Sequence, residues 1–123
     1  GELLSTRARY LQAAGCLTDG SVRDVRVIRE MKFPVFTGGI NPVDTKYRGK
    51  LTWYDVPGKI HGVEVQSGDL VFGDVDGVVV IPKKLVETVL DKSLQKVSEE
   101  NMVRKKLVSG ESLEKIFADH GIL

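Results

Sequence analysis

The hydrophobic residues in the first part of the chain follow helical and strand spacing in turn. Between Leu3 and Ala14 apolar residues recur every three or four positions, which predicts an amphipathic helix that ends at Gly15. The segments predicted after it are a short buried strand at 16–18, a turn at 19–21, a helix at 24–31 and a strand at 33–36. The first 36 residues therefore predict the order α-β-α-β.

The middle of the chain changes from irregular to strand-like patterning. Residues 37–49 carry glycines and an Asn-Pro pair, which predicts a long irregular loop of the kind that compact domains keep for function or assembly. Alternation over 50–56 predicts an exposed or edge strand. The apolar segments that follow are separated by turn residues and predict a buried β meander at 60–65, 70–72 and 78–81.

A long helix is predicted from Lys83 to Ser109. Its apolar stripe is regular as far as Val97 and then continues in a shifted phase, so we expect the distal end to face a partner chain rather than its own core. Ser112 is a plausible N-cap for a last helix, which Gly121 closes.

Composition and charge narrow the class of protein. With 123 residues, 41% of them apolar and 28% charged, the chain matches one compact soluble domain over 1–123. The net charge of +1 argues against nucleic-acid binding, and no apolar run approaches the roughly 20 residues of a membrane helix. We therefore expect a cytoplasmic protein without a membrane partner. Because the chain begins with Gly rather than Met, we also expect that something upstream has been removed, whether an initiator methionine, a tag or a whole segment.

The cysteine and histidine content limits the kinds of metal site that the chain could form. Cys16 is the only cysteine, and the two histidines, His61 and His120, are far apart in sequence. A thiolate cluster or a zinc site with several imidazoles is therefore not expected. Any bound metal would be held by carboxylates and water.

Two short segments could carry chemistry. Gly1 to Leu4 begins a helix, where unpaired backbone N–H groups suit a carboxylate or phosphate, although every helix start offers this geometry. The segment 18–24 ends a strand with Arg23 beside Asp24. Such a pair suits an anionic, oxygen-rich substrate and a hard divalent cation. The alternative is that Asp24 only favours the helix start and Arg23 is a surface charge.

Three motifs give the chain a recognisable resemblance. They are Gly-Glu-Leu-Leu at 1–4, the run from Gly15 to Asp24, and Gly-Asp-Leu-Val-Phe-Gly-Asp-Val-Asp-Gly-Val-Val-Val-Ile-Pro at 68–82. The chain resembles, over nearly all its length to the ending 121–123, the family that includes 4-hydroxy-4-methyl-2-oxoglutarate aldolase and the regulator of ribonuclease activity A. Members usually carry a segment ahead of the first motif, so this chain resembles their C-terminal portion. The fold implied is α/β, a layered β/β/α swivelling-type domain with a central β meander and a long C-terminal helix.

The resemblance also implies roles for individual residues. Substrate would be bound at Gly1 and by the backbone amides of Leu3 and Leu4, which grip a keto-acid carboxylate. Arg23 would contact the same substrate, and Asp24 would anchor Mg²⁺ or Mn²⁺, partly through waters. A cation stabilises the pyruvate enolate as a C–C bond breaks, so cleavage of 4-hydroxy-4-methyl-2-oxoglutarate and decarboxylation of oxaloacetate share one intermediate.

Assembly and alternatives follow from the same resemblance. Family enzymes are trimers with the pocket between subunits, so Glu99 or Glu100 could reach a neighbour's metal site, or both could be solvated glutamates on a helix. Aldolase members commonly have an acidic residue three places after the Asp, where this chain has Val27. The alternative to a lyase is a non-catalytic regulator that binds an RNA-degrading enzyme.

Overall fold

The computed structural model describes residues 1–121, apart from the side chain of His120, so the ending at 122–123 lies outside the described residues. The chain divides into two compact units, an N-terminal unit, Gly1–Pro82, and a C-terminal unit that begins at Lys83. Each unit is described by itself. The single domain over 1–123 stays a prediction.

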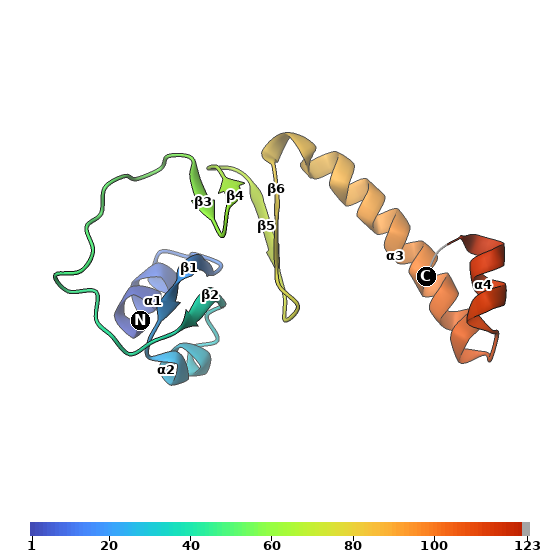
Figure 1. Ribbon diagram of the computed structural model, residues 1–123, viewed down its shortest axis with the longest axis horizontal. Helices are drawn as coiled ribbons and strands as arrows, with labels where there is room; N and C mark the ends of the chain where they lie inside the picture. The colour runs from blue at the N-terminus through green and yellow to red at the C-terminus, as the bar shows by residue number, and fades with distance from the viewer. Residues whose placement is uncertain (122–123) are drawn as a thin grey trace. The chain divides into compact units, whose positions relative to one another are not determined.

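The N-terminal unit begins with an α-β-α-β segment, as the hydrophobic spacing predicted (Figure 1). Its elements are α1 (Glu2–Tyr10), β1 (Cys16–Val22), α2 (Val25–Glu30) and β2 (Val35–Ile40). β1 and β2 pair in parallel, and α2 makes the crossover between them. Ile28 and Phe33 are buried and form the core of this segment.

Two predicted boundaries in this segment were wrong. α1 ends at Tyr10 instead of reaching Ala14, and Leu11, the first residue after it, is largely exposed. Gln12 then takes a left-handed backbone conformation, with φ of 63°. The turn predicted at 19–21 is part of β1, where the pairing with β2 shifts between Thr18 and Ser21.

A long loop over residues 41–57 joins β2 to β3 and arches between them in Figure 1. The irregular excursion predicted over 37–49 is confirmed from residue 41 onward. The strand predicted over 50–56 is absent, and Leu51, Trp53 and Tyr54 are exposed. Alternation alone is insufficient here, because no strand of the described chain pairs with this segment.

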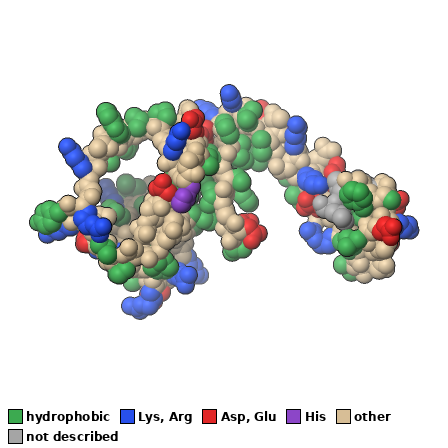
Figure 2. Space-filling model, viewed as in Figure 1, with side chains coloured by type: hydrophobic (Ala, Val, Ile, Leu, Met, Phe, Trp, Pro, Cys, Tyr) green, Lys and Arg blue, Asp and Glu red, His purple; other side chains and the backbone are tan. Residues whose placement is uncertain are grey.

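Two antiparallel hairpins complete the N-terminal unit. β3 (Gly58–Ile60) pairs with β4 (Val63–Val65), and β5 (Leu70–Gly73) pairs with β6 (Val78–Ile81). β5 and β6 match the segments predicted at 70–72 and 78–81, whereas the segment predicted at 60–65 is divided into β4 and part of β3. The hairpins form separate two-stranded sheets, and hydrophobic side chains remain exposed on β5 and β6 (Figure 2). The expectation of a buried meander was therefore wrong for this chain. Gly73 lies against the Phe36 ring, and this contact joins β5 to β2.

The C-terminal unit consists of a short 3₁₀ helix, η1 (Lys83–Leu85), a long helix, α3 (Val86–Val108), and α4 (Leu113–His120). Ser112 caps α4, as predicted, and its hydroxyl accepts a hydrogen bond from the Lys115 N–H at 3.3 Å. Gly121 ends α4 with φ of 64°.

Burial in this unit reverses the sequence-based expectation for α3. Leu90 and Leu94, from the regular stripe, are exposed, whereas Val103, beyond the phase shift, is buried. Ile116 of α4 is fully buried, and α3 packs against α4. The distal end of α3 thus has a core of its own because the chain folds back as α4. The predicted α/β class with a long C-terminal helix is confirmed. Among the described residues, no helix combines the length and the apolar character that a membrane span requires.

Candidate functional site

A pocket of about 920 Å³ lies within the N-terminal unit. Three segments line it: the start of α1, the end of β1 with the turn into α2, and the first residues of the 41–57 loop. Its lining includes Gly1, Leu3, Leu4, Ser5, Arg23, Asp24, Asn41, Val43 and Thr45. The predicted substrate-binding and catalytic residues of the N-terminal unit are therefore brought together around one cavity.

Asp24 occupies the junction between β1 and α2. It is the N-cap residue of α2 and has a left-handed backbone, with φ of 60° and ψ of 30°, a conformation that Asp tolerates better than most side chains. Its Oδ2 atom accepts a hydrogen bond from the Glu2 N–H at 3.0 Å. The Arg23 Nε lies 3.6 Å from the same oxygen. This one carboxylate oxygen thus contacts both the start of α1 and the neighbouring guanidinium.

Gly1 lies against Asp24 and Arg23, with no room for a side chain. A Cβ atom on Gly1 would collide with Asp24 Oδ2 and lie 3.0 Å from Arg23 Cγ. The Gly1 carbonyl accepts hydrogen bonds from the Ser5 N–H at 3.1 Å and from the buried Ser5 hydroxyl at 3.2 Å. Its backbone is therefore fixed beside the two charged residues.

Leu3 and Leu4 lie in the first turn of α1 and are among the residues that line the pocket. Both residues are 77% exposed, so neither leucine belongs to the core of the N-terminal unit. The first N–H groups of an α-helix have no carbonyl partner within the helix and lie at the positive end of its dipole. The start of α1 consequently offers the pocket hydrogen-bond donors that suit an anion.

Sequence reasoning missed Asp44, which lies in the long loop. Arg23 Nη1 donates to Asp44 Oδ2 at 2.7 Å, and this hydrogen bond and charge lower the pKa of Asp44 and raise that of Arg23. The guanidinium therefore contacts two carboxylates, Asp44 and Asp24. The only signal in the sequence was the length of the loop, which gave no indication of the residue it places beside Arg23.

The donor set at Asp24 fits a cation that keeps several waters. No cluster of three metal-ligating side chains occurs among the described residues. Asp24 Oδ1, however, makes no hydrogen bond or ion pair within residues 1–121, so it can accept a further ligand. Mg²⁺ is commonly held by one or two carboxylates together with water and substrate oxygens.

Two other predictions concern residues outside the pocket. Glu99 and Glu100 lie on α3, in the C-terminal unit, where Glu99 accepts a hydrogen bond from Gln95 Nε2 at 3.0 Å. Their proposed reach to a neighbouring subunit stays a prediction. Val27 lies on α2 and is not among the residues that line the pocket within the described chain.

Comparison with known proteins identifies the family of this chain. The family model described as Aldolase/RraA matches residues 1–80, which include every residue of the pocket. The chain belongs to the RraA-like family. The resemblance inferred from the three motifs is therefore confirmed.

Several relatives of this chain carry aldolase names, whereas Protein DlpA of Legionella pneumophila, 33% identical over 98% of this chain and 20% of that protein, does not. A protein of Halalkalibacterium halodurans, provisionally named a 4-hydroxy-4-methyl-2-oxoglutarate aldolase, is 36% identical over 109 residues, which are 89% of this chain and 51% of that protein. The 4-hydroxy-4-methyl-2-oxoglutarate aldolase of Thermus thermophilus is 34% identical over 70 residues, 57% of this chain and 42% of that enzyme. The chain thus spans about half the length of these two relatives with aldolase names.

A solved structure supports the fold over nearly the whole chain. An uncharacterized protein from Pseudomonas syringae matches with a TM-score of 0.92 and 28% sequence identity. The match covers 97% of this chain and 56% of that protein. This chain and the Pseudomonas syringae protein therefore share the same fold.

Proposed function

We propose that this RraA-like chain carries the keto-acid site of a divalent-cation-dependent lyase. The substrates are pyruvate-derived keto acids. 4-Hydroxy-4-methyl-2-oxoglutarate would undergo aldol cleavage, and oxaloacetate would be decarboxylated. The observation that carries the proposal is the convergence of Arg23, Asp24 and the start of α1 on one pocket. The names of the relatives support the same reaction class.

In this proposal the helix start binds the carboxylate of the pyruvate unit and Arg23 binds its keto oxygen. The N–H groups of Leu3 and Leu4 hold the carboxylate, and the Arg23 guanidinium faces the keto oxygen, where negative charge develops as the C–C bond breaks. A fixed donor at such an oxygen contributes about 3 kcal/mol, or 10²- to 10³-fold in kcat. The pocket is large enough for a dicarboxylic keto acid.

Asp24 supplies the carboxylate for the cation. Its Oδ1 would hold Mg²⁺ or Mn²⁺, with waters and the oxygens of the keto acid as the remaining ligands. When bound, such a cation stabilises negative charge on the substrate oxygens without a covalent Schiff base. The protein's own part is to orient the Asp24 carboxylate, which the Glu2 N–H and Arg23 do through their contacts with Oδ2.

Val27 favours decarboxylation over aldol cleavage. Aldol cleavage requires a base to remove the proton from the substrate hydroxyl, whereas loss of CO₂ from oxaloacetate does not. This chain has valine at the position where aldolase members commonly carry an acidic residue. We therefore expect oxaloacetate to be the better of the two substrates.

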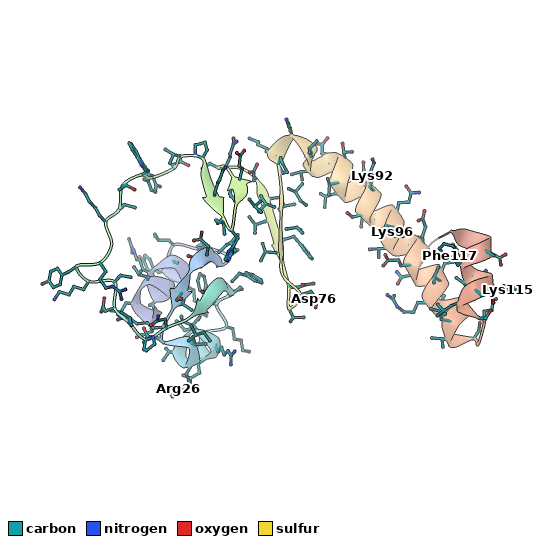
Figure 3. The ribbon with its side chains drawn as sticks, in the orientation of Figure 1. Arg26, Asp76, Lys92, Lys96, Lys115 and Phe117 are labelled. Atoms are coloured by element: carbon teal, nitrogen blue, oxygen red, sulfur yellow. The ribbon has the colours of Figure 1, made fainter. Side chains whose placement is uncertain are left out.

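The test uses the complete protein that contains this chain, incubated with oxaloacetate in Mg²⁺ or in EDTA, with pyruvate release as the readout. We expect release that depends on Mg²⁺ and falls about 100-fold in Arg23→Ala. Arg26→Ala is the matched control, because Arg26 projects from α2 with its side chain 85% exposed (Figure 3). Pyruvate release at the spontaneous rate in the wild-type protein would overturn the proposal.

The family description also names RraA, so a regulatory function is the second candidate. A regulator would bind an RNA-degrading enzyme through its surface and would not need the pocket. Such a complex would persist in Arg23→Ala and Asp24→Ala, whereas the lyase activity would be lost. Measuring both properties on the same variants separates the two functions.

A further inference from the structure

We propose that Asp44 is a positioning residue, which fixes the Arg23 guanidinium and thereby sets its direction in the pocket. The inference rests on the proposed function for the role of Arg23 toward a keto acid. The contact between Asp44 and Arg23, however, can be tested without any reaction.

The geometry leaves one guanidinium nitrogen for a ligand. Nη1 donates to Asp44 Oδ2 at 2.7 Å, and Nε lies 3.6 Å from Asp24 Oδ2. Since a guanidinium is planar and rigid, restraint at two of its three nitrogens fixes the orientation of the whole group. Nη2 makes no hydrogen bond or ion pair within residues 1–121 and remains for substrate.

The backbone of the loop holds the Asp44 side chain in place, so Asp44 can restrain Arg23. Its other oxygen, Oδ1, accepts a hydrogen bond from the Lys46 N–H at 2.8 Å. Immediately before it, the Asn41 side chain accepts one from the Val43 N–H at 3.0 Å. Two consecutive side-chain turns therefore order the start of the loop, where Asn41, Val43 and Thr45 line the pocket.

The magnitudes favour a role in orientation over one in stability. The Arg23 and Asp44 side chains are 38% and 56% exposed, and ion pairs this accessible to water add little to folding. A misplacement of a binding group by about 1 Å, in contrast, can cost up to 10²-fold in rate. Loss of Asp44 should therefore lower the activity of the site more than it lowers the stability of the fold.

Asp44→Asn separates the two contacts of this residue. The remaining carbonyl oxygen can still accept from the Lys46 N–H, but the amide nitrogen cannot accept from Arg23. We expect kcat/KM for oxaloacetate to fall about tenfold. Glu30→Gln is the matched control, since it breaks an exposed ion pair with Arg26, with N–O distance 3.4 Å, on a helix outside the pocket.

A double-mutant cycle shows whether Asp44 acts through Arg23. If it does, Asp44→Asn has no further effect on kcat/KM once Arg23 is replaced by alanine. An equal loss in the wild-type and Arg23→Ala backgrounds would mean that Asp44 acts on the loop instead, and would overturn the proposal.

Labelling with phenylglyoxal provides the readout that is independent of activity. The rate of modification at Arg23, followed by mass spectrometry, should rise several-fold in Asp44→Asn, while Arg26 in the same sample stays unchanged. Equal labelling of Arg23 in both proteins would overturn the proposal. A wild-type protein that shows no turnover but keeps Arg23 protected would refute the proposed function and leave the positioning by Asp44 supported.

Discussion

The backbone N–H of Glu2 donates a hydrogen bond to Asp24 Oδ2 at 3.0 Å, across 22 positions of sequence. The bond joins the start of α1 to the residue at the N-cap position of α2, and Arg23 Nε approaches the same oxygen. Asp24 therefore has a structural task at Oδ2 and a free oxygen, Oδ1, for chemistry. The two tasks can be separated by substitution.

Asp24→Asn should lower the cation-dependent activity and leave the fold intact. Asparagine retains an oxygen for the Glu2 N–H and tolerates the left-handed backbone, but it has no negative charge to hold a cation. We expect Mg²⁺-dependent pyruvate release to fall about 10- to 100-fold with little change in the thermal unfolding midpoint. Unchanged activity with the same Mg²⁺ dependence would contradict this role of Asp24.

Asp24→Ala should in addition weaken the fold. Alanine cannot accept from the Glu2 N–H and is disfavoured at φ of 60°. The expected loss is about 1 kcal/mol in the free energy of unfolding relative to Asp24→Asn, measured by urea denaturation. Equal stability of the two variants would show that Oδ2 has no structural task.

Gly1→Ala should block the site by steric conflict. Its methyl group would collide with Asp24 Oδ2 and press on the Arg23 side chain, so both charged groups must move. We expect pyruvate binding, measured by calorimetry on the complete protein, to weaken by at least tenfold. Gly49→Ala is the control, because a Cβ atom there meets nothing within 4 Å. Normal binding in Gly1→Ala would show that the pocket does not need this close approach.

The sequence predicted the elements whose signals are local. The α-β-α-β start, the strands of the β5–β6 hairpin and the Ser112 cap each depend on neighbouring residues, and all were found. The adjacency of Arg23 and Asp24 likewise needs no distant information. Their approach to Gly1 came from family resemblance rather than from spacing.

Contacts between distant segments were the part that sequence could not supply. Asp44 reaches Arg23 from a loop without periodicity, 21 positions away, so no pattern marks it. The strand expected over 50–56 had the right alternation but no partner strand. The exposed stripe of α3 was assigned to a core because spacing shows which face is apolar and not what covers it.

The pKa of Asp44 gives a pH-dependent prediction. The hydrogen bond from Arg23, followed by that from the Lys46 N–H, lowers the pKa of this carboxyl below its ordinary 3.8. A lowered pKa means that the ion pair is intact at neutral pH and is lost only as pH falls through that lowered value. We expect the Asp44 carboxyl to titrate below 3.8 by NMR and to move upward in Arg23→Ala. The same midpoint in both proteins would show that the pair does not form in solution.

Ile116→Ala tests the small core that α4 forms with α3. Ile116 is completely buried, and Val103 of α3 is also buried, so the substitution leaves a cavity in a unit with few buried apolar side chains among its described residues. Such a cavity costs about 2–5 kcal/mol, which should appear as faster amide hydrogen exchange in α4 and the end of α3. Phe117→Ala is the matched control, because Phe117, the next residue, is 54% exposed and should cost less than about 1 kcal/mol (Figure 3). Similar exchange rates in the two variants would mean that the distal end of α3 is stabilised by something other than α4.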